Sequence, residues 1–278
     1  MIAGKSGTLI VDAGNSPAHA RLLLRGLAEL DLPKPKYLAL THGHWYHVFG
    51  ASIYHVPVIA NRETQLIIDK MAKYDWSDEA LDRRVDEGLE IEFCRDMIKA
   101  EMPCRDDLVI KPPDMIFNSP TNIDLGETSC QFIPIGGDHS SDSSIVYIPD
   151  DKVIFLGDCI YPNIHSIAPS YTTNKLLPLL SQLLGFDADY YLAAHDPEPM
   201  TRRQMEEFTT IARLAGRMVE DEGLDRESIL KFLQAKIGTD LNSDTYELVD
   251  GFIAGLNKPG DQVDQTIFPH VTLTGLHR

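Results

Sequence analysis

Short apolar runs rich in β-branched residues alternate with segments of helical periodicity along most of the chain. The runs predict strands at 8–12, 37–41, 56–60, 130–135, 144–148, 153–156 and, as the final strand, 190–194. Helical spacing predicts helices at 16–30, 61–75 and 174–184, and the charged residues 76–115 predict a helix followed by a loop. The first helix has Ser16 as its N-cap and Pro17 in its first turn. This alternation is typical of a layered α/β sandwich.

The pattern changes after residue 199, where three helical stretches follow one another at 200–222, 225–237 and 243–256. Beyond Pro259 the apolar residues show neither helical nor strand periodicity. We therefore predict two parts: a domain at 1–199 with a helical insert at about 61–115, and a helical C-terminal extension at 200–278. The extension carries an apolar stripe at helical spacing, which we expect to pack on the body or on a second copy in a homodimer. The stripe consists of Phe208, Ile211, Leu214 and Met218.

Charge and composition narrow the class of partner. The 278 residues include 25 Lys and Arg against 42 Asp and Glu, a formal net charge of −17. This counts against nucleic acid and membrane surfaces as partners, because both attract a basic face. No apolar run is long enough to span a membrane, and the first residues lack the pattern of a signal peptide. The four cysteines form no CxxC pair, which favours a reducing compartment. We expect a cytoplasmic protein with a small-molecule substrate.

The segment Thr41-His42-Gly43-His44-Trp45-Tyr46-His47 directly follows a predicted strand. Imidazole is the commonest metal ligand in proteins. His42 and His44 can place both rings around one ion as the chain leaves the strand, and His47 can face a neighbouring ion. The alternative is a packing cluster of histidines without a metal. The position at a strand end favours the metal site.

Further Asp and His residues also come just after predicted strands, at Asp12, His139, Asp158 and His195. Strand ends that converge on one rim would bring these side chains to the histidine segment. Tyr161, Asn163 and His165 follow Asp158 on the same loop and are candidates for substrate contact. The sequence contains no GxSxG, GxxxxGK[ST] or GxGxxG motif that would indicate a competing chemistry.

The order DxG, THxHxxH, His, GD, His resembles the metallo-β-lactamase superfamily over residues 8 to about 197. The resemblance implies a four-layer αββα sandwich with one or two divalent ions at the sheet edges, most often zinc and sometimes iron or manganese. It implies that His42, His44 and His139 hold a first ion, that His47, Asp158 and His195 hold a second, and that Asp158 bridges them. Asp12 corresponds to the carboxylate that orients a ligand, although it also fits a turn before Gly14.

Two features depart from the family pattern. The family has HxHxDH, and Tyr46 replaces the aspartate that ligates the second ion and holds the attacking water. A phenol with a pKa of about 10 is a poor substitute for a carboxylate, so we expect an occupied first site and a second one that is weak, empty or rearranged. Tyr46 is also a candidate functional group, either as a phenolate ligand, if a metal lowers its pKa strongly, or as a catalytic group that donates a hydrogen bond to the oxyanion or leaving group. In addition, only seven residues precede Thr8: either residues 1–5 form a shortened first strand, or the chain begins late.

The resemblance implies a hydrolase that uses a metal-bound hydroxide on an ester, thioester, lactone, amide or phosphoester, with Asp158 and Tyr46 as candidate catalytic residues. A small acyl compound is the first substrate class to test. The alternative is a metal-binding but catalytically impaired member with a structural or regulatory role, which Tyr46 motivates. A redox di-iron protein ranks below both, because such relatives usually carry a carboxylate where His44 stands.

Overall fold

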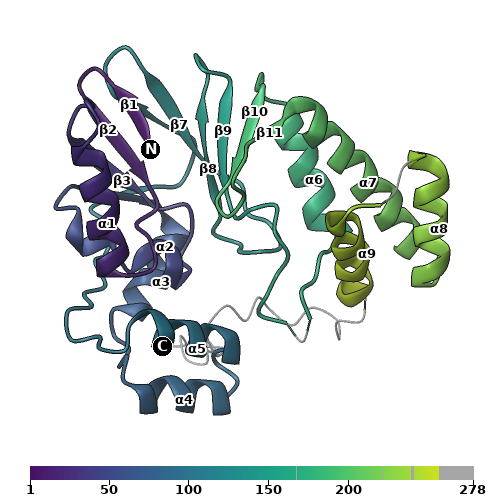
Figure 1. Cartoon of the computed structure of the whole chain (residues 1–278), viewed down its shortest axis with the longest axis horizontal. Helices are drawn as coiled ribbons and strands as arrows, with labels where there is room; N and C mark the ends of the chain where they lie inside the picture. Colours follow the sequence, from purple (N-terminus) through teal and green to yellow (C-terminus); the bar gives the residue numbers. More distant parts are fainter. Residues whose placement is uncertain (167, 221, 239–240, 257–278) are drawn as a thin grey trace, which may run out of the picture.

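The computed structural model describes residues 1–166, 168–220, 222–238 and 241–256, and it shows two β-sheets packed face to face (Figure 1). The first sheet has the order β1-β2-β3-β4-β5, parallel except for the β1–β2 pair. Its strands are β1 (Ile2–Gly4), β2 (Gly7–Val11), β3 (Pro35–Ala39), β4 (Val58–Asn61) and β5 (Met115–Phe117).

The second sheet has the order β11-β10-β9-β8-β7-β6 and is antiparallel except for the β9–β10 pair. Its strands are β6 (Thr121–Asp124), β7 (Ser129–Pro134), β8 (Ser144–Ile148), β9 (Val153–Gly157), β10 (Tyr190–Ala193) and β11 (Met200–Thr201). The parallel pair places the C-terminal ends of β9 and β10 at the same edge of the sheet, from which two of the predicted donor loops leave.

Helices cover the outer face of each sheet, which confirms the four-layer αββα sandwich (Figure 1). The first sheet packs on α1 (Pro17–Ala28), α2 (Trp45–Val48), η1 (Ala51–Ile53) and α3 (Arg62–Met71). The second sheet packs on α6 (Thr173–Leu184) and α7 (Arg202–Glu220). Neighbouring residues of β2 show why the strand is apolar throughout: Leu9 lies between the sheets and Ile10 lies under the helices.

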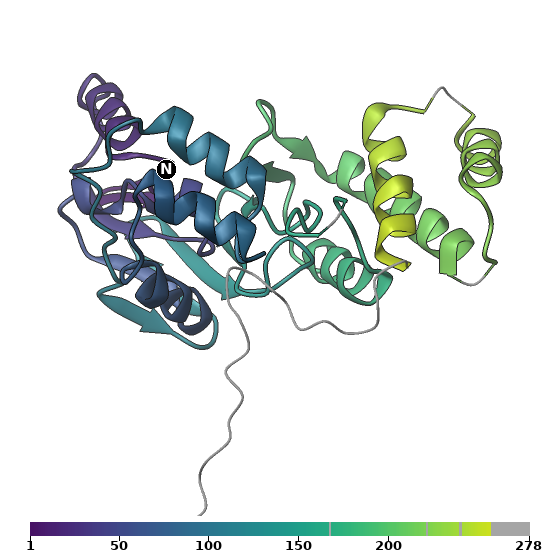
Figure 2. The same ribbon diagram turned by 90° about the horizontal axis from the view of Figure 1, so that it is seen from below.

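The helical insert predicted at 61–115 contains α3 and two further helices, α4 (Asp78–Asp86) and α5 (Glu92–Glu101), so the prediction of one helix and a loop at 76–115 was wrong. The helices α4 and α5 lie side by side below the first sheet in Figure 1 and face the viewer in Figure 2. Leu81 of α4 and Ile98 of α5 share a buried apolar cluster with Trp45 and Phe49. The insert therefore packs directly against the segment that carries the histidine motif.

Short strands account for most differences from the predicted elements. Residues 1–5 do contribute a shortened first strand, β1. The prediction of 190–194 as the final strand was wrong, because β11 follows it, and β5 and β6 were also missed. These strands have two to four residues, too few for a period to show. In β6 only Ile123 is buried.

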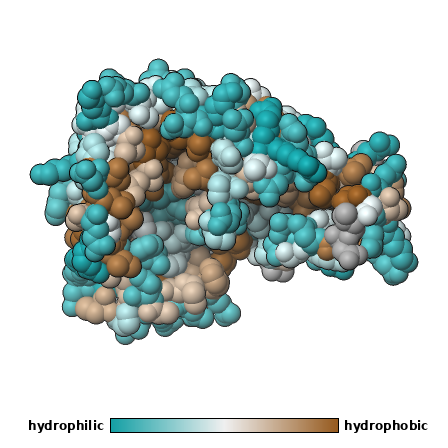
Figure 3. All heavy atoms as spheres, turned by 45° about the horizontal axis from the view of Figure 1, so that its top comes forward, coloured by the Kyte–Doolittle hydropathy of each residue, from teal (hydrophilic) through white to brown (hydrophobic). Residues whose placement is uncertain are grey.

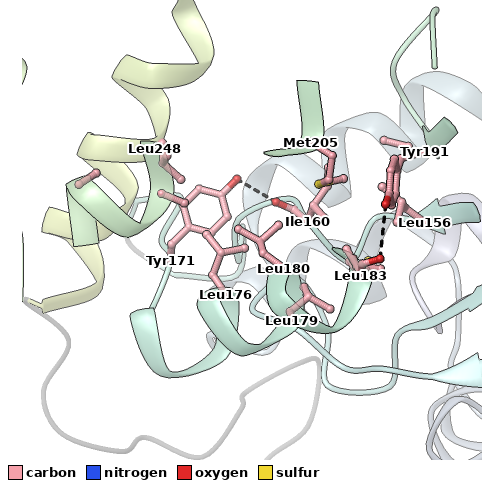
Figure 4. Close-up of a cluster of buried hydrophobic side chains, with 14 of the residues drawn as sticks. Leu156, Ile160, Tyr171, Leu176, Leu179, Leu180, Leu183, Tyr191, Met205 and Leu248 are labelled. Carbon is pink, nitrogen blue, oxygen red and sulfur yellow. Dashed lines mark hydrogen bonds between the residues drawn. The ribbon is translucent and has the colours of Figure 1, made fainter. Parts of the chain in front are cut away.

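The C-terminal helices α7, α8 (Arg226–Ile237) and α9 (Ser243–Leu256) pack on the body of the same chain. Figure 4 shows this core, in which Met205 of α7 and Leu248 of α9 join side chains of α6 and the second sheet. In the predicted stripe, Met218 is buried and the other three residues are partly buried. The homodimer and the domain boundary at residue 199 stay predictions. Residues 257–278, which include the tail beyond Pro259, lie outside the described residues.

The surface is predominantly hydrophilic on the face shown in Figure 3, where hydrophobic residues gather around a hollow in the broader part of the molecule. Some large apolar side chains are exposed elsewhere in the fold, among them Leu22 of α1 and Phe93 of α5. Within the described part of the chain, no helix has the length and apolarity needed to cross a bilayer.

Candidate metal centre

The predicted donor residues follow five strands and meet at one edge of the sandwich. They follow β2 (Asp12), β3 (His42, His44, His47), β7 (His139), β9 (Asp158) and β10 (His195). The ligand atoms of His42, His44 and His139 lie within 4.8 Å of one another, and so do those of His42, His47 and Asp158. We call His42, His44 and His139 the histidine group, and His47, Asp158 and His195 the Asp158 group. The structure thus brings every predicted donor into one cluster.

The histidine group is almost completely buried, with exposed fractions of 0% to 3%. Nδ1 of His44 lies 2.9 Å from Nε2 of His139. Nδ1 of His139 donates to the Pro162 carbonyl at 3.0 Å, which leaves its Nε2 as a bare lone pair. Nδ1 of His42 lies 3.0 Å from Oγ1 of Thr41, so its Nε2 is also directed at the cluster. Two of the three rings are therefore held in the tautomer that a metal ion requires.

The Asp158 group gathers around one carboxylate oxygen. Oδ2 of Asp158 lies 3.2 Å from Nε2 of His47, 3.2 Å from Nε2 of His195 and 3.3 Å from Nε2 of His139. Burial acts to raise the pKa of Asp158, but the imidazoles of His47, which acts most strongly, and His195 hold it well below its usual range. The side chain of His195 is 55% exposed, whereas Asp158 and His47 are buried. One partner of this group therefore faces solvent.

Asp12 contacts one member of each group, His47 directly and His42 through Thr41. Its Oδ2 accepts a hydrogen bond from Nδ1 of His47 at 2.8 Å, which turns Nε2 of His47 towards Asp158. Its Oδ1 accepts from the Thr41 backbone N–H at 2.8 Å, and the Thr41 hydroxyl donates to the same carboxylate. Asp12 has a positive φ of 61°, which Asp tolerates better than most residues. It therefore both makes the turn and orients His47 directly, and His42 through Thr41.

His47 is protonated near neutral pH because two carboxylates lie beside its ring. Burial lowers the pKa of His47, but the carboxylates of Asp12 and Asp158 outweigh it and raise the value to about 10. A metal ion must therefore displace a proton from this ring. In His42 and His44, by contrast, burial lowers the pKa and favours the neutral, metal-binding base.

The Tyr46 hydroxyl points into the middle of the cluster. It lies 3.1 Å from Nδ1 of His44, 3.0 Å from Nε2 of His139 and 3.2 Å from Oδ2 of Asp158. Burial, and then the charge of Asp158, raise the pKa of this phenol. The oxygen thus contacts two members of the histidine group, although the family pattern assigns this sequence position to the second ion.

Asp142 has a positioning role that the sequence did not reveal. This buried carboxylate accepts from the Gly43 backbone N–H at 2.8 Å, from Oγ1 of Thr64 at 2.7 Å and from Oγ of Ser140. It therefore ties the residue between His42 and His44 to the loop that carries His139. An acidic residue in a serine-rich loop three positions after His139 was the only signal in the sequence.

The loop after Asp158 lies against both groups. The His165 ring is 5.2 Å from the His44 ring, and the Tyr161 ring is 5.8 Å from the His195 ring. The Tyr161 hydroxyl accepts from the His195 backbone N–H at 3.3 Å. Two of the three loop residues expected to contact substrate therefore lie beside predicted donors, while Asn163 pairs with the backbone of Ser170 in the same loop.

The donor set fits a divalent metal ion. Among the described residues, Nε2 of His42 and Oδ1 of Asp158 are buried and have no hydrogen-bond partner. Buried polar atoms without partners are costly unless a further group satisfies them. Imidazole nitrogen with carboxylate oxygen is a donor combination that suits zinc and also iron and manganese.

Comparison with models of protein families identifies the family of this chain. The model of the metallo-beta-lactamase superfamily matches residues 1–195, which is more than half of the chain. The chain belongs to the metallo-beta-lactamase superfamily. Members of this superfamily are metal-dependent hydrolases, and the fold binds divalent metals through clusters of His and Asp. No curated protein matches the chain.

Several solved structures share the fold at low sequence identity. A family protein of Thermus thermophilus is 16% identical, with 90% of this chain and 83% of that chain covered and a TM-score of 0.55. A superfamily protein of Sulfolobus tokodaii is 18% identical, with 91% and 90% covered and a TM-score of 0.52. The stereoselective inverting sec-alkylsulfatase Pisa1 from Pseudomonas sp. is 13% identical and has a TM-score of 0.57, with 91% of this chain but only 47% of the sulfatase covered.

Proposed function

We propose that the protein is a metal-dependent hydrolase that cleaves a small-molecule ester, thioester, lactone, amide or phosphoester. The observation that carries this proposal is the convergence of five histidines and Asp158 on one buried cluster that fits a divalent ion. Zinc is the proposed metal, with iron and manganese as the alternatives. The net charge of −17 supports a small substrate over nucleic acid, and free cysteines among the described residues support a cytoplasmic location.

The residues of the chain have separable roles in this proposal. The histidine group would hold one ion, and the Asp158 group would hold a second or complete the first. When bound, a divalent ion supplies Lewis acidity and a nucleophilic water near neutral pH. Asp12 keeps a proton on Nδ1 of His47, and the Pro162 carbonyl does the same for His139, so that both rings present Nε2 to the ion.

A second function is favoured by Tyr46. Its hydroxyl takes up space at the centre of the cluster, against His44, His139 and Asp158. A carboxylate at this position would add a negative charge and leave more room for water. A metal-binding protein with impaired turnover and a structural or regulatory role is therefore the competing proposal.

Turnover by the zinc-loaded protein on a panel of the five substrate classes separates the two functions. For the hydrolase we expect turnover by wild type that a chelator removes and zinc restores. For the impaired protein we expect no turnover by wild type and a gain only in Tyr46→Asp. Tyr46→Asn is the matched control, because it has the size of Asp without the charge. An inactive wild type together with an inactive Tyr46→Asp, both loaded with zinc, would contradict hydrolysis of these classes.

A further inference from the structure

Four polar atoms from different parts of the chain lie at the mutual distances of donors around one ion. They are Nδ1 of His44, Nε2 of His139, Oη of Tyr46 and Oδ2 of Asp158, and five of their six separations fall between 2.9 and 3.3 Å. Metal–ligand bonds of about 2.0–2.2 Å place neighbouring donor atoms of one ion roughly 3 Å apart or slightly more. Tyr46 therefore stands in the position of a ligand.

Hydrogen bonding alone leaves part of this arrangement unexplained. The Tyr46 hydroxyl donates its one proton to Asp158, and Nδ1 of His44 and Nε2 of His139 lie within 3.1 Å of the same oxygen. Nε2 of His139 carries a lone pair, because Nδ1 of the same ring donates to Pro162, so it cannot donate to the Asp158 oxygen that lies 3.3 Å away. Within the part of the chain that the structure describes, Nε2 of His42 also lacks a partner, and it lies 3.8 Å from Oδ2 of Asp158. Lone pairs that converge in this way are satisfied together by a cation.

We propose that Tyr46 is a ligand of the ion held by the histidine group and that it binds through its phenolate oxygen. This inference rests on the metal centre of the proposed function. On binding, the phenolic O–H bond breaks, the oxygen–metal bond forms and the proton passes to the solvent buffer. Of the two functional roles that the sequence leaves open for Tyr46, ligand or hydrogen-bond donor, this proposal selects the ligand.

Charge then limits the number of ions. The phenolate and the Asp158 carboxylate together carry two negative charges, which neutralise one divalent ion among neutral imidazoles. A second ion beside His47 and His195 would meet no further negative charge among the predicted ligands, and the nearby carboxylate of Asp12 already accepts hydrogen bonds from Nδ1 of His47 and the Thr41 N–H. Removal of ions from water is costly without such compensation. The protein therefore binds one divalent ion tightly per chain.

The test uses the full chain, freed of metal by a chelator and then titrated with zinc. We expect the ultraviolet difference spectrum of tyrosinate to grow up to one equivalent of zinc and then stop. Tyr46→Phe should lose this signal. Tyr171→Phe is the matched control, because Tyr171 is also buried and its hydroxyl donates to the Ile160 carbonyl, away from the cluster (Figure 4). It should keep the signal of wild type.

A second probe does not depend on any variant. Ferric iron bound to wild type should give a visible phenolate-to-iron charge-transfer band. One equivalent of zinc bound without a tyrosinate signal would overturn the ligand role and leave the metal centre intact. A signal that survives in Tyr46→Phe would overturn it as well, and two tightly bound ions per chain would overturn the limit of one. A wild type that binds no metal would reject the metal centre itself.

Discussion

The histidine group and the Asp158 group differ in how firmly the protein holds them. All three members of the histidine group are buried, and Thr41 and Pro162 fix two of the rings from outside. In the Asp158 group, Asp12 fixes His47 in the same way, while the side chain of His195 is more than half exposed. A ligand whose rotamer and tautomer are already set loses less freedom when it binds an ion. The comparison therefore indicates that the first ion binds at the histidine group.

The largest expected effect comes from removing two members of the histidine group. His42→Ala combined with His44→Ala should abolish tight metal binding, because it removes two neutral nitrogen donors from a buried site. Metal content after equilibrium dialysis measures this. The control is His19→Ala, since His19 is exposed on α1. An unchanged metal content in the double variant would show that the histidine group is not the site.

A smaller loss of metal affinity should follow from changing Asp12, which orients ligands in both groups. Asp12→Asn keeps a side chain that tolerates positive φ but removes the charge that faces Nδ1 of His47. We expect metal affinity to fall by about 10- to 100-fold, as is usual when the partner of a ligand is lost. A competition titration against a chelator measures this, with the exposed Asp31→Asn as control. Equal affinities for Asp12→Asn and wild type would contradict the orienting role.

The smallest effect is expected at the exposed edge of the Asp158 group. His195→Ala should lower the free energy of unfolding of the metal-free protein by about 1 kcal/mol, because it removes one hydrogen bond to Asp158 but leaves little buried surface unfilled. It should also leave the first equivalent of metal bound. Denaturant unfolding and metal stoichiometry test both statements. Loss of the first equivalent in this variant would break the distinction between the two groups.

The fold was largely predictable because the central strands are buried on both faces. Leu9 and Ile10 enter different cores, so the whole run around them is apolar and visible in the sequence. Strand β11 consists only of Met200 and Thr201 and exists through its pairing with β10, which no local pattern encodes. The long C-terminal helices were predictable because their hydrophobic residues repeat at helical spacing over several turns. Strand β6 has four residues, which is too short for an alternating pattern to show.

The site was predictable as a set of residues but not as a geometry. His and Asp at strand ends are a local pattern, and the structure brings all of them together. The contact between Tyr46 and His139 joins residues 93 positions apart, and the bond from Gly43 to Asp142 joins residues 99 positions apart. Such contacts depend on how two loops approach each other across the sandwich. The direction of the Tyr46 hydroxyl and the role of Asp142 therefore became visible only in the folded chain.

The distance along the chain between Asp12 and His195 also has a consequence for the order of folding. The donors come from both sheets, and the last of them follows β10, near the end of the region that the family model matches. Contacts between residues so far apart form only after long loops have closed, so they form late. During synthesis, a nascent chain that ends before β10 has the histidine motif but not the complete cluster. Every donor of the proposed ion precedes β10, so capture of the ion waits for the second sheet up to β9, and β10 then adds only His195.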